Sequence, residues 1–255
     1  MVRGMDARRG IFTDFLLATA VLTRLPVGIA APGDGMVAAS CWAFPLVGAG
    51  IGFIAGLAFF AAELLGIGAL PAALLAVLAG VAATGALHED GLADTVDGFG
   101  GGTDRAAKLA IMRDSRVGAY GAIALVFSIG LRAAAIAAIG DPIHAGLALI
   151  AAHAAARGLL APAMLLLPPA REDGLGAAAG RPSRVVAMVA VAIGGVIALG
   201  CLGPRAGTVA LALAGAAVAA IAVLARRQIG GYTGDVLGAF QQIGEIVILL
   251  VAATP

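Results

Sequence analysis

Charged residues, aromatic residues and cysteines are scarce in this sequence of 255 residues. Only 12% of the residues are charged, 5% are aromatic, and two are cysteines. Cys41 and Cys201 lie far apart in apolar surroundings, so neither a disulfide framework nor a zinc site can be built from them. The net charge of +1 offers no general nucleic-acid footprint, so we expect no nucleic acid as a partner.

Hydrophobic residues are abundant instead, at 61%, together with 38 glycines. Apolar runs of 18 residues or more recur along the chain, which predicts an all-α, polytopic transmembrane helical bundle surrounded by membrane lipid. Seven spans are predicted, over residues 40–66, 69–87, 119–140, 142–168, 184–204, 206–225 and 235–254. No repeat or linker divides the chain, so we expect a single domain over residues 1–255. The oligomeric state stays open, a homo-oligomer included.

The apolar stretch from Ile11 to Leu22 is too short to span and is expected to be an interfacial or re-entrant helix. Thirteen loop cations fall on alternate connections, and only Arg205 falls on the others. The first group comes from the N-terminal segment with Arg3, Arg8, Arg9 and Arg24, and from residues 88–118, 169–184 and 226–234. The positive-inside rule therefore predicts a bacterial inner-membrane protein whose cation-rich loops face the cytoplasm, with the C-terminus on the opposite side.

Residues 88–118 form a polar island between apolar runs. They hold six of the 15 acidic residues, and Asp90, Asp94 and Asp97 are spaced so that one helix face carries all three. Three carboxylates so close repel one another unless a cation lies between them. Oxygen ligands favour Mg²⁺ or Mn²⁺ over zinc. The alternative is a solvated charged loop between two helices.

The glycines that follow are expected to end this helix. Gly98 and the run Gly100–Gly102 should break it and let the backbone approach a ligand. Thr103 is the expected N-cap of a second helix that carries Arg105, Lys108 and Arg113. Carboxylates, a glycine loop and nearby cations together suit a phosphate or diphosphate bridged by a metal ion. In a later glycine-rich loop, Asp235 opens a helix and could add a ligand to that site.

Ionisable residues inside spans indicate function because their burial is costly. Arg132, Arg157, His153, Glu63 and Glu245 are of this kind. For Arg157 two interpretations stay open: a contact to an anion or phosphate, and a structural pairing with Glu245.

The run HEDGLADTVDGFGGG, with IMRDSRVGAYG after it, resembles the signature of the adenosylcobinamide-GDP ribazoletransferase (cobalamin synthase) family. The resemblance extends to TRLPV at 23–27, FPLVG at 44–48, EDGLG at 172–176 and GGYTGDVLGAFQQ at 230–242. Glu89 departs from it, because the family usually has an apolar residue there, and its role stays undetermined.

This resemblance implies a Mg²⁺-dependent membrane enzyme that joins adenosylcobinamide-GDP to α-ribazole or its 5′-phosphate and releases GMP. Asp90, Asp94, Asp97 and Asp114 would hold metal, and His88 or an aspartate would act as the general base. The phosphate-binding candidates are Gly100, Gly101, Arg105, Lys108, Arg113, Arg116 and Arg157.

Two alternatives remain at this stage. Asp94–Gly98 also resembles the DxxDG opening of the CDP-alcohol phosphotransferases, which would release CMP. A cation transporter would use acids in a helical bundle as an ion path, but transporters usually place them near the membrane midplane, and these acids are gathered in one segment.

Overall fold

The structure is a computed structural model that describes residues 10–28 and 35–254, so Arg3, Arg8 and Arg9 lie outside the described residues. The described part is helical, and its only β-type pairing is an isolated bridge between Pro169 and Tyr232. The helices are α1 (Ile11–Leu22), α2 (Met36–Ser40), η1 (Cys41–Ala43), α3 (Phe44–Leu64), α4 (Ala69–Thr84), α5 (Leu87–Gly101), α6 (Arg105–Ile111), α7 (Ala119–Ile139), α8 (Pro142–Gly158), α9 (Leu160–Leu166), α10 (Leu175–Ala178), α11 (Arg184–Ile229) and α12 (Gly234–Ala252).

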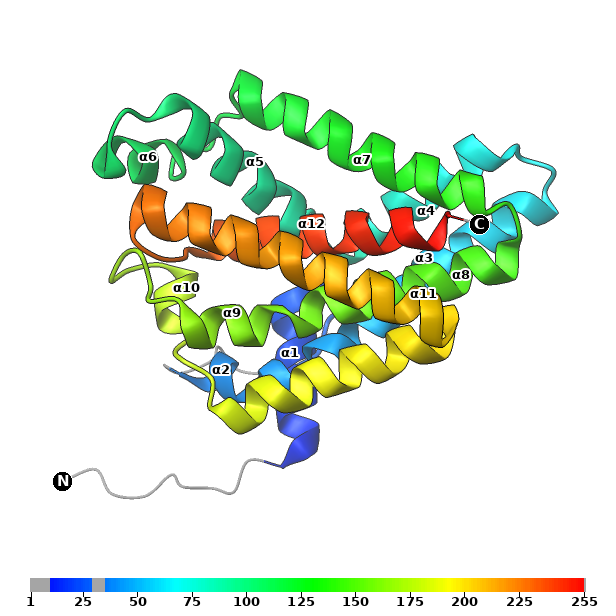
Figure 1. The fold of residues 1–255 in the computed structure, drawn as a ribbon, viewed down its shortest axis with the longest axis horizontal. Coiled ribbons are helices and arrows are strands. Elements are labelled where there is room, and N and C mark those ends of the chain that lie inside the picture. The colour runs from blue at the N-terminus through cyan, green and yellow to red at the C-terminus, as the bar shows by residue number, and fades with distance from the viewer. Residues whose placement is uncertain (1–9, 29–34, 255) are drawn as a thin grey trace.

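The long helices lie side by side along the longest axis of the molecule (Figure 1). The short helices α6 and α10 gather at one end of this bundle, on the left of the view, and the C-terminus lies toward the opposite end. We call the first of these the loop end. It holds three polar loops, over residues 102–118, 167–183 and 230–233, which come from distant parts of the sequence.

Five of the described helices are long and apolar enough to cross a membrane, and a sixth crossing is added when α4 and α5 are taken as one bent span. Helix α11 contains two of the predicted spans. Gly203 has a φ of 77° and precedes Pro204, so the helix breaks there. The two halves then run back along each other (Figure 1), and a Cβ on Gly207 would lie 3.0 Å from the Leu199 Cα.

Glycines in α3 allow that helix to pack backbone to backbone against α8. A Cβ on Gly48 would lie 2.3 Å from the His153 carbonyl oxygen, and one on Gly52 would lie 2.5 Å from that of Leu149. Small residues at a spacing of four let helices approach closely where lipid removes the hydrophobic drive to associate. This pairing places the polar residues of α8 inside the bundle.

The polar island differs from its sequence-based description. Helix α4 ends at Thr84. Gly85 and Ala86, which follow it, both have positive φ, and the chain turns by 92° into α5. Residues 88–101 of the island, which include Asp90, Asp94 and Asp97, then belong to helix α5 and not to a loop, and this helix packs against α7 and α12. The expected break at Gly98 was wrong, because the helix continues to Gly101. The expected end at the run Gly100–Gly102 is confirmed, since Gly102 is the C-cap. A Cβ on Gly98 would lie 2.5 Å from the Met112 side chain, so glycine here permits close packing within a continuous helix.

The following helix also begins differently. Its N-cap is Asp104 and not Thr103, since Asp104 Oδ1 accepts a hydrogen bond of 2.9 Å from the Ala107 amide. It ends at Ile111, so Arg113 lies in the turn beyond it.

Candidate functional site

The three aspartates of α5 lie on one face of that helix, as their spacing predicts, but they are buried to different degrees. Asp90 is exposed, Asp94 is half-buried and Asp97 is buried. The face therefore runs from solvent into the protein, in the direction of the loop end.

Helix α12 supplies a fourth carboxylate because glycines allow it to touch α5. A Cβ on Gly91 would lie 2.7 Å from the Asp235 carbonyl oxygen, and a Cβ on Gly238 would lie 3.1 Å from that of His88. Asp235 stands in the first turn of α12, which Thr233 caps by accepting a hydrogen bond from the Val236 amide. The close crossing explains why two motifs about 140 residues apart belong to one site.

The charge of Asp94 is opposed by its surroundings. Partial burial disfavours it most, Asp90, Asp235 and Asp97 add repulsion, and Arg171 is the cation that attracts it. Arg171 Nη2 also lies 3.4 Å from Asp235 Oδ2. We call Asp90, Asp94 and Asp235, together with Arg171, the acid cluster. Three acids face one arginine in this cluster, so the protein leaves negative charge there without a compensating partner.

The donor chemistry of the acid cluster fits a hard divalent cation, since all of its candidate ligands are carboxylate oxygens. Within the described residues, however, no three His, Cys, Asp or Glu side chains are already arranged closely enough to hold one ion. Side-chain rotation of Asp90, Asp94 and Asp235 would have to accompany binding.

Asp97 is held by two backbone amides that the sequence did not reveal as its partners. Its Oδ2 accepts a hydrogen bond of 2.7 Å from the Gly118 amide, and its Oδ1 accepts one of 2.9 Å from the Gly121 amide. These amides belong to the N-terminus of α7, where free N–H groups and the helix dipole stabilise a carboxylate. A Cβ on either glycine would lie within 2.4 Å of an Asp97 oxygen. Asp97 therefore caps α7 from a neighbouring helix.

Asp114 does not join the acid cluster. It is paired with Arg116 at 2.6 Å on the surface, and hydrogen bonds from Arg116 lower the pKa of Asp114 to about 2. Arg113 is likewise exposed and pairs with Asp173 at 2.5 Å. The structure thus gives both of these predicted phosphate-binding arginines a carboxylate of their own.

The remaining predicted phosphate-binding residues of the island have different surroundings. Arg105 donates to the carbonyl oxygens of Ile229 at 2.8 Å and Ala170 at 2.6 Å, which ties α6 to the end of α11 and to the loop at 167–183. The space beside Gly100 is filled by the Tyr120 ring, and that beside Gly101 is approached by Ile111. Lys108 is half-buried at the loop end.

A second group of charges lies inside the bundle, on the other side of α5. Glu89 is paired with Arg132 at 3.0 Å, and Arg132 also reaches Glu245 at 3.1 Å. Glu245 in turn contacts His153 at 3.0 Å and Arg157 at 3.9 Å. We call these five residues the buried ion network. All five are less than a tenth exposed.

This network answers two questions that the sequence left open. Arg157 is 1% exposed, and its Nη1 lies 3.9 Å from Glu245 Oε2, which supports the structural pairing with Glu245. Glu89, the departure from the family pattern, is an ion-pair partner that also accepts a hydrogen bond of 3.0 Å from Gln242 Nε2.

His88 faces the buried ion network and not the acid cluster. It is 3% exposed, and the charges that act on it are those of Arg157, Glu245, His153 and Arg132. Its location does not favour the role of general base for a reaction at Asp94.

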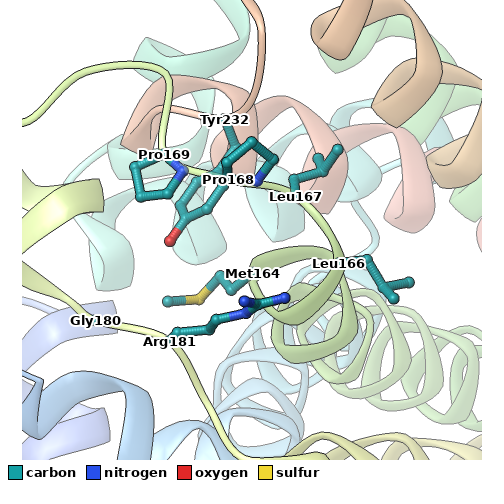
Figure 2. A pocket seen from close by; sticks show the side chains of 8 residues that line it. All are labelled: Met164, Leu166, Leu167, Pro168, Pro169, Gly180, Arg181 and Tyr232. Carbon is teal, nitrogen blue, oxygen red and sulfur yellow. The ribbon is translucent and has the colours of Figure 1, made fainter.

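A pocket of about 270 Å³ opens beside the Pro169–Tyr232 bridge (Figure 2). Its polar groups are already engaged, because the Tyr232 hydroxyl donates to the Gly176 carbonyl and Arg181 donates to that of Leu165. None of the acid cluster residues lines it.

The residue that sequence reasoning missed is Arg171. It directly precedes the EDGLG motif, and as one of several arginines in a cation-rich loop it resembled an ordinary topology signal. Its position next to the EDGLG motif, which matches the family, was the signal that could have identified it.

Comparisons with known proteins identify the family of this chain. The family model described as cobalamin-5-phosphate synthase matches residues 14–253. A protein of Bradyrhizobium diazoefficiens named adenosylcobinamide-GDP ribazoletransferase is 49% identical over 254 residues, which covers 99% of this chain and 98% of the relative. Proteins of the same name from Mesorhizobium japonicum (96% of this chain, 94% of the relative) and Azorhizobium caulinodans (94% and 95%) are 50% and 44% identical. No solved structure matches. Nearly the whole chain is covered, and it belongs to the cobalamin-5-phosphate synthase family.

Proposed function

We propose that this protein transfers the adenosylcobinamide-phosphate group from adenosylcobinamide-GDP to a hydroxyl of α-ribazole or its 5′-phosphate. The products are GMP and adenosylcobalamin or its 5′-phosphate. The name shared by relatives along nearly the full chain supports this reaction. The observation that carries it in the structure is the acid cluster, in which three aspartates and one arginine meet at the loop end.

The reaction requires charge neutralisation and positioning more than covalent chemistry by the protein. The acceptor oxygen forms a bond to the phosphorus that carries cobinamide, and the bond from this phosphorus to the GMP oxygen breaks. GMP leaves with the bonding electrons, and the hydroxyl proton passes to a base. Asp90, Asp94 and Asp235 would hold Mg²⁺, or Mn²⁺ in its place, which would neutralise charge on the diphosphate.

The protein's own groups then have separable roles. Asp94 is half-buried beside two other carboxylates that repel its charge, so a cation or a proton that enters the cluster would be bound most favourably there. An aspartate of the acid cluster is a better candidate for the proton acceptor than His88, which is buried beside the ion network. Asp97 fixes the start of α7 against α5.

The same proposal includes an orientation in the membrane. The alternating loop cations support a bacterial inner-membrane protein whose loop end faces the cytoplasm, where a nucleotide-activated substrate is available. The C-terminus would then lie on the opposite side, in keeping with its position far from the loop end (Figure 1).

The test is an assay of purified protein in lipid with Mg²⁺, adenosylcobinamide-GDP and α-ribazole 5′-phosphate. We expect GMP to appear only when both substrates and the metal are present, and to disappear with EDTA. Release of CMP from a CDP-alcohol, with no GMP from the cobinamide substrate, would instead identify a phospholipid-type phosphotransferase.

A further inference from the structure

We propose that Arg171 binds the phosphate oxygens of the guanosine-diphosphate part of the donor substrate. This inference rests on the proposed function and assigns a role in it to a residue from a loop outside the polar island.

The guanidinium of Arg171 is only partly used by the protein. Its side chain is 18% exposed, and Nη2 makes one long contact of 3.4 Å to Asp235 Oδ2. Nη1 is buried, and no hydrogen-bond acceptor for it is found among the described residues. A buried donor without an acceptor is costly, most of all on a charged group. A phosphate oxygen at this position would remove that cost and suits the planar, forked geometry of an arginine.

Arg105, Arg113 and Arg116, the other arginines considered at the loop end, form shorter hydrogen bonds or ion pairs within the protein. Arg105 holds two backbone carbonyls at 2.8 and 2.6 Å. Arg113 and Arg116 each form a short, exposed ion pair with an aspartate of the loops. Of these four arginines, Arg171 alone both attracts the Asp94 carboxylate and has a buried N–H group, on Nη1, without a hydrogen-bond acceptor among the described residues.

The backbone before Arg171 is fixed in advance. The Ala170 amide donates to the Tyr232 carbonyl at 2.7 Å, and the Ala170 carbonyl accepts from Arg105. The Tyr232 amide donates to the Pro168 carbonyl at 3.0 Å, which closes the bridge between the two loops. The Arg171 side chain therefore projects from a fixed backbone, so little conformational entropy is lost when a ligand binds to it.

Asp235 is the natural competitor for Arg171. The Thr233 hydroxyl already donates to Asp235 Oδ2 at 3.0 Å, so this carboxylate keeps a partner when Arg171 turns away. The exchange of one weak contact for a charge-assisted pair with a diphosphate would favour the bound state.

The test measures nucleotide binding apart from turnover. Titration calorimetry in lipid nanodiscs with MgCl₂ would compare GDP with guanosine, for wild-type protein and for Arg171→Ala, Arg171→Lys and Arg113→Ala. Wild-type protein should bind GDP more tightly than guanosine. Arg171→Ala should weaken GDP binding roughly ten- to a hundredfold and leave guanosine binding unchanged. Arg171→Lys should recover part of the loss, and Arg113→Ala should match the wild type.

A purely structural role for Arg171 would lower both affinities together and keep their ratio, and that result would overturn the inference. Equal GDP affinity in Arg171→Ala and the wild type would also overturn it. If Arg171→Ala does not fold, Arg171→Lys carries the same comparison. A wild-type protein that neither releases GMP nor binds GDP would contradict the proposed function itself. An active wild type, with the same ratio of GDP to guanosine affinity in Arg171→Ala as in the wild type, would contradict only the role of Arg171.

Discussion

The acid cluster and the buried ion network lie on opposite sides of helix α5, and neighbouring residues of the chain divide between them. Glu89 points into the network, where Arg132 compensates its charge. Asp90, the next residue, is exposed and belongs to the cluster. In the network, two glutamates meet two arginines and a histidine. In the cluster, three aspartates meet one arginine.

This difference distinguishes ion pairs that stabilise the fold from excess charge that is suited to binding a ligand. A buried pair must be balanced, because an isolated ion inside the bundle would be too costly. A half-exposed excess of one sign can persist, and perturbed ionisable groups of this kind gather at functional sites. The comparison makes opposite predictions for the two regions: loss of activity without unfolding in the first, and loss of stability in the second.

The largest effect on activity is expected from Asp94→Asn. Removing the central charge of the acid cluster should lower GMP release by about a thousandfold, because stabilisation of transferred charge depends on it. Thermal unfolding in detergent should remain close to that of the wild type. Asp173→Asn, an exposed aspartate paired with Arg113, is the matched control and should retain normal turnover. Normal turnover in Asp94→Asn would remove the acid cluster from the mechanism.

The largest effect on stability is expected from Arg132→Leu. This change leaves Glu89 and Glu245 without their shared arginine, and breaking a buried pair costs about 3–5 kcal/mol. Thermal unfolding followed by circular dichroism would measure it, with the exposed Arg116→Leu as the control. An unaltered melting temperature for Arg132→Leu would mean that the network does not support the fold.

An intermediate effect is expected from Asp97→Asn, which distinguishes a helix cap from a metal ligand. An asparagine keeps one acceptor but loses the charge at the N-terminus of α7, so stability should fall by about 1–2 kcal/mol. Turnover should fall much less than in Asp94→Asn. The reverse outcome, full stability with turnover as low as in Asp94→Asn, would return Asp97 to the metal ligands.

The smallest effect is expected from Arg113→Ala. Its ion pair with Asp173 is exposed on both sides, and such pairs contribute about 0–1 kcal/mol. Unfolding temperature and GMP release should both remain near the wild-type values. A strong loss of activity would show that Arg113 exchanges Asp173 for substrate and would contradict the contrast drawn with Arg171.

Local periodicity predicted part of this site correctly. The helical bundle, the common face of Asp90, Asp94 and Asp97, and the helix that begins at Asp235 all follow from spacing within a few residues. The glycine run ends the helix as predicted, but the break at Gly98 was wrong because propensity treats every glycine as a helix breaker. In α5, Gly98 and Gly100 instead make room for Met112 and Tyr120, and that packing is a tertiary property.

Long-range partners could not be predicted from spacing. Glu89 meets Arg132 and Gln242, and Asp97 meets Gly118 and Gly121, through contacts that depend on how helices cross. The cost of burying ions did indicate that Arg132, Arg157 and Glu245 need partners, but it could not choose among them. Arg171 was missed because a loop arginine has the same sequence signal whether it sets topology or binds substrate.

The capping of α7 by Asp97 has a consequence for the segment between the two helices. Residues 102–117 leave the bundle at the end of α5 and return where Asp97 holds the amides of Gly118 and Gly121. The excursion therefore starts and finishes at nearly one point, where hydrogen bonds fix the start of α7 against α5 in addition to the chain that joins them. We expect a protein assembled from two polypeptides divided within this segment to bring α5 and α7 together through the same contacts.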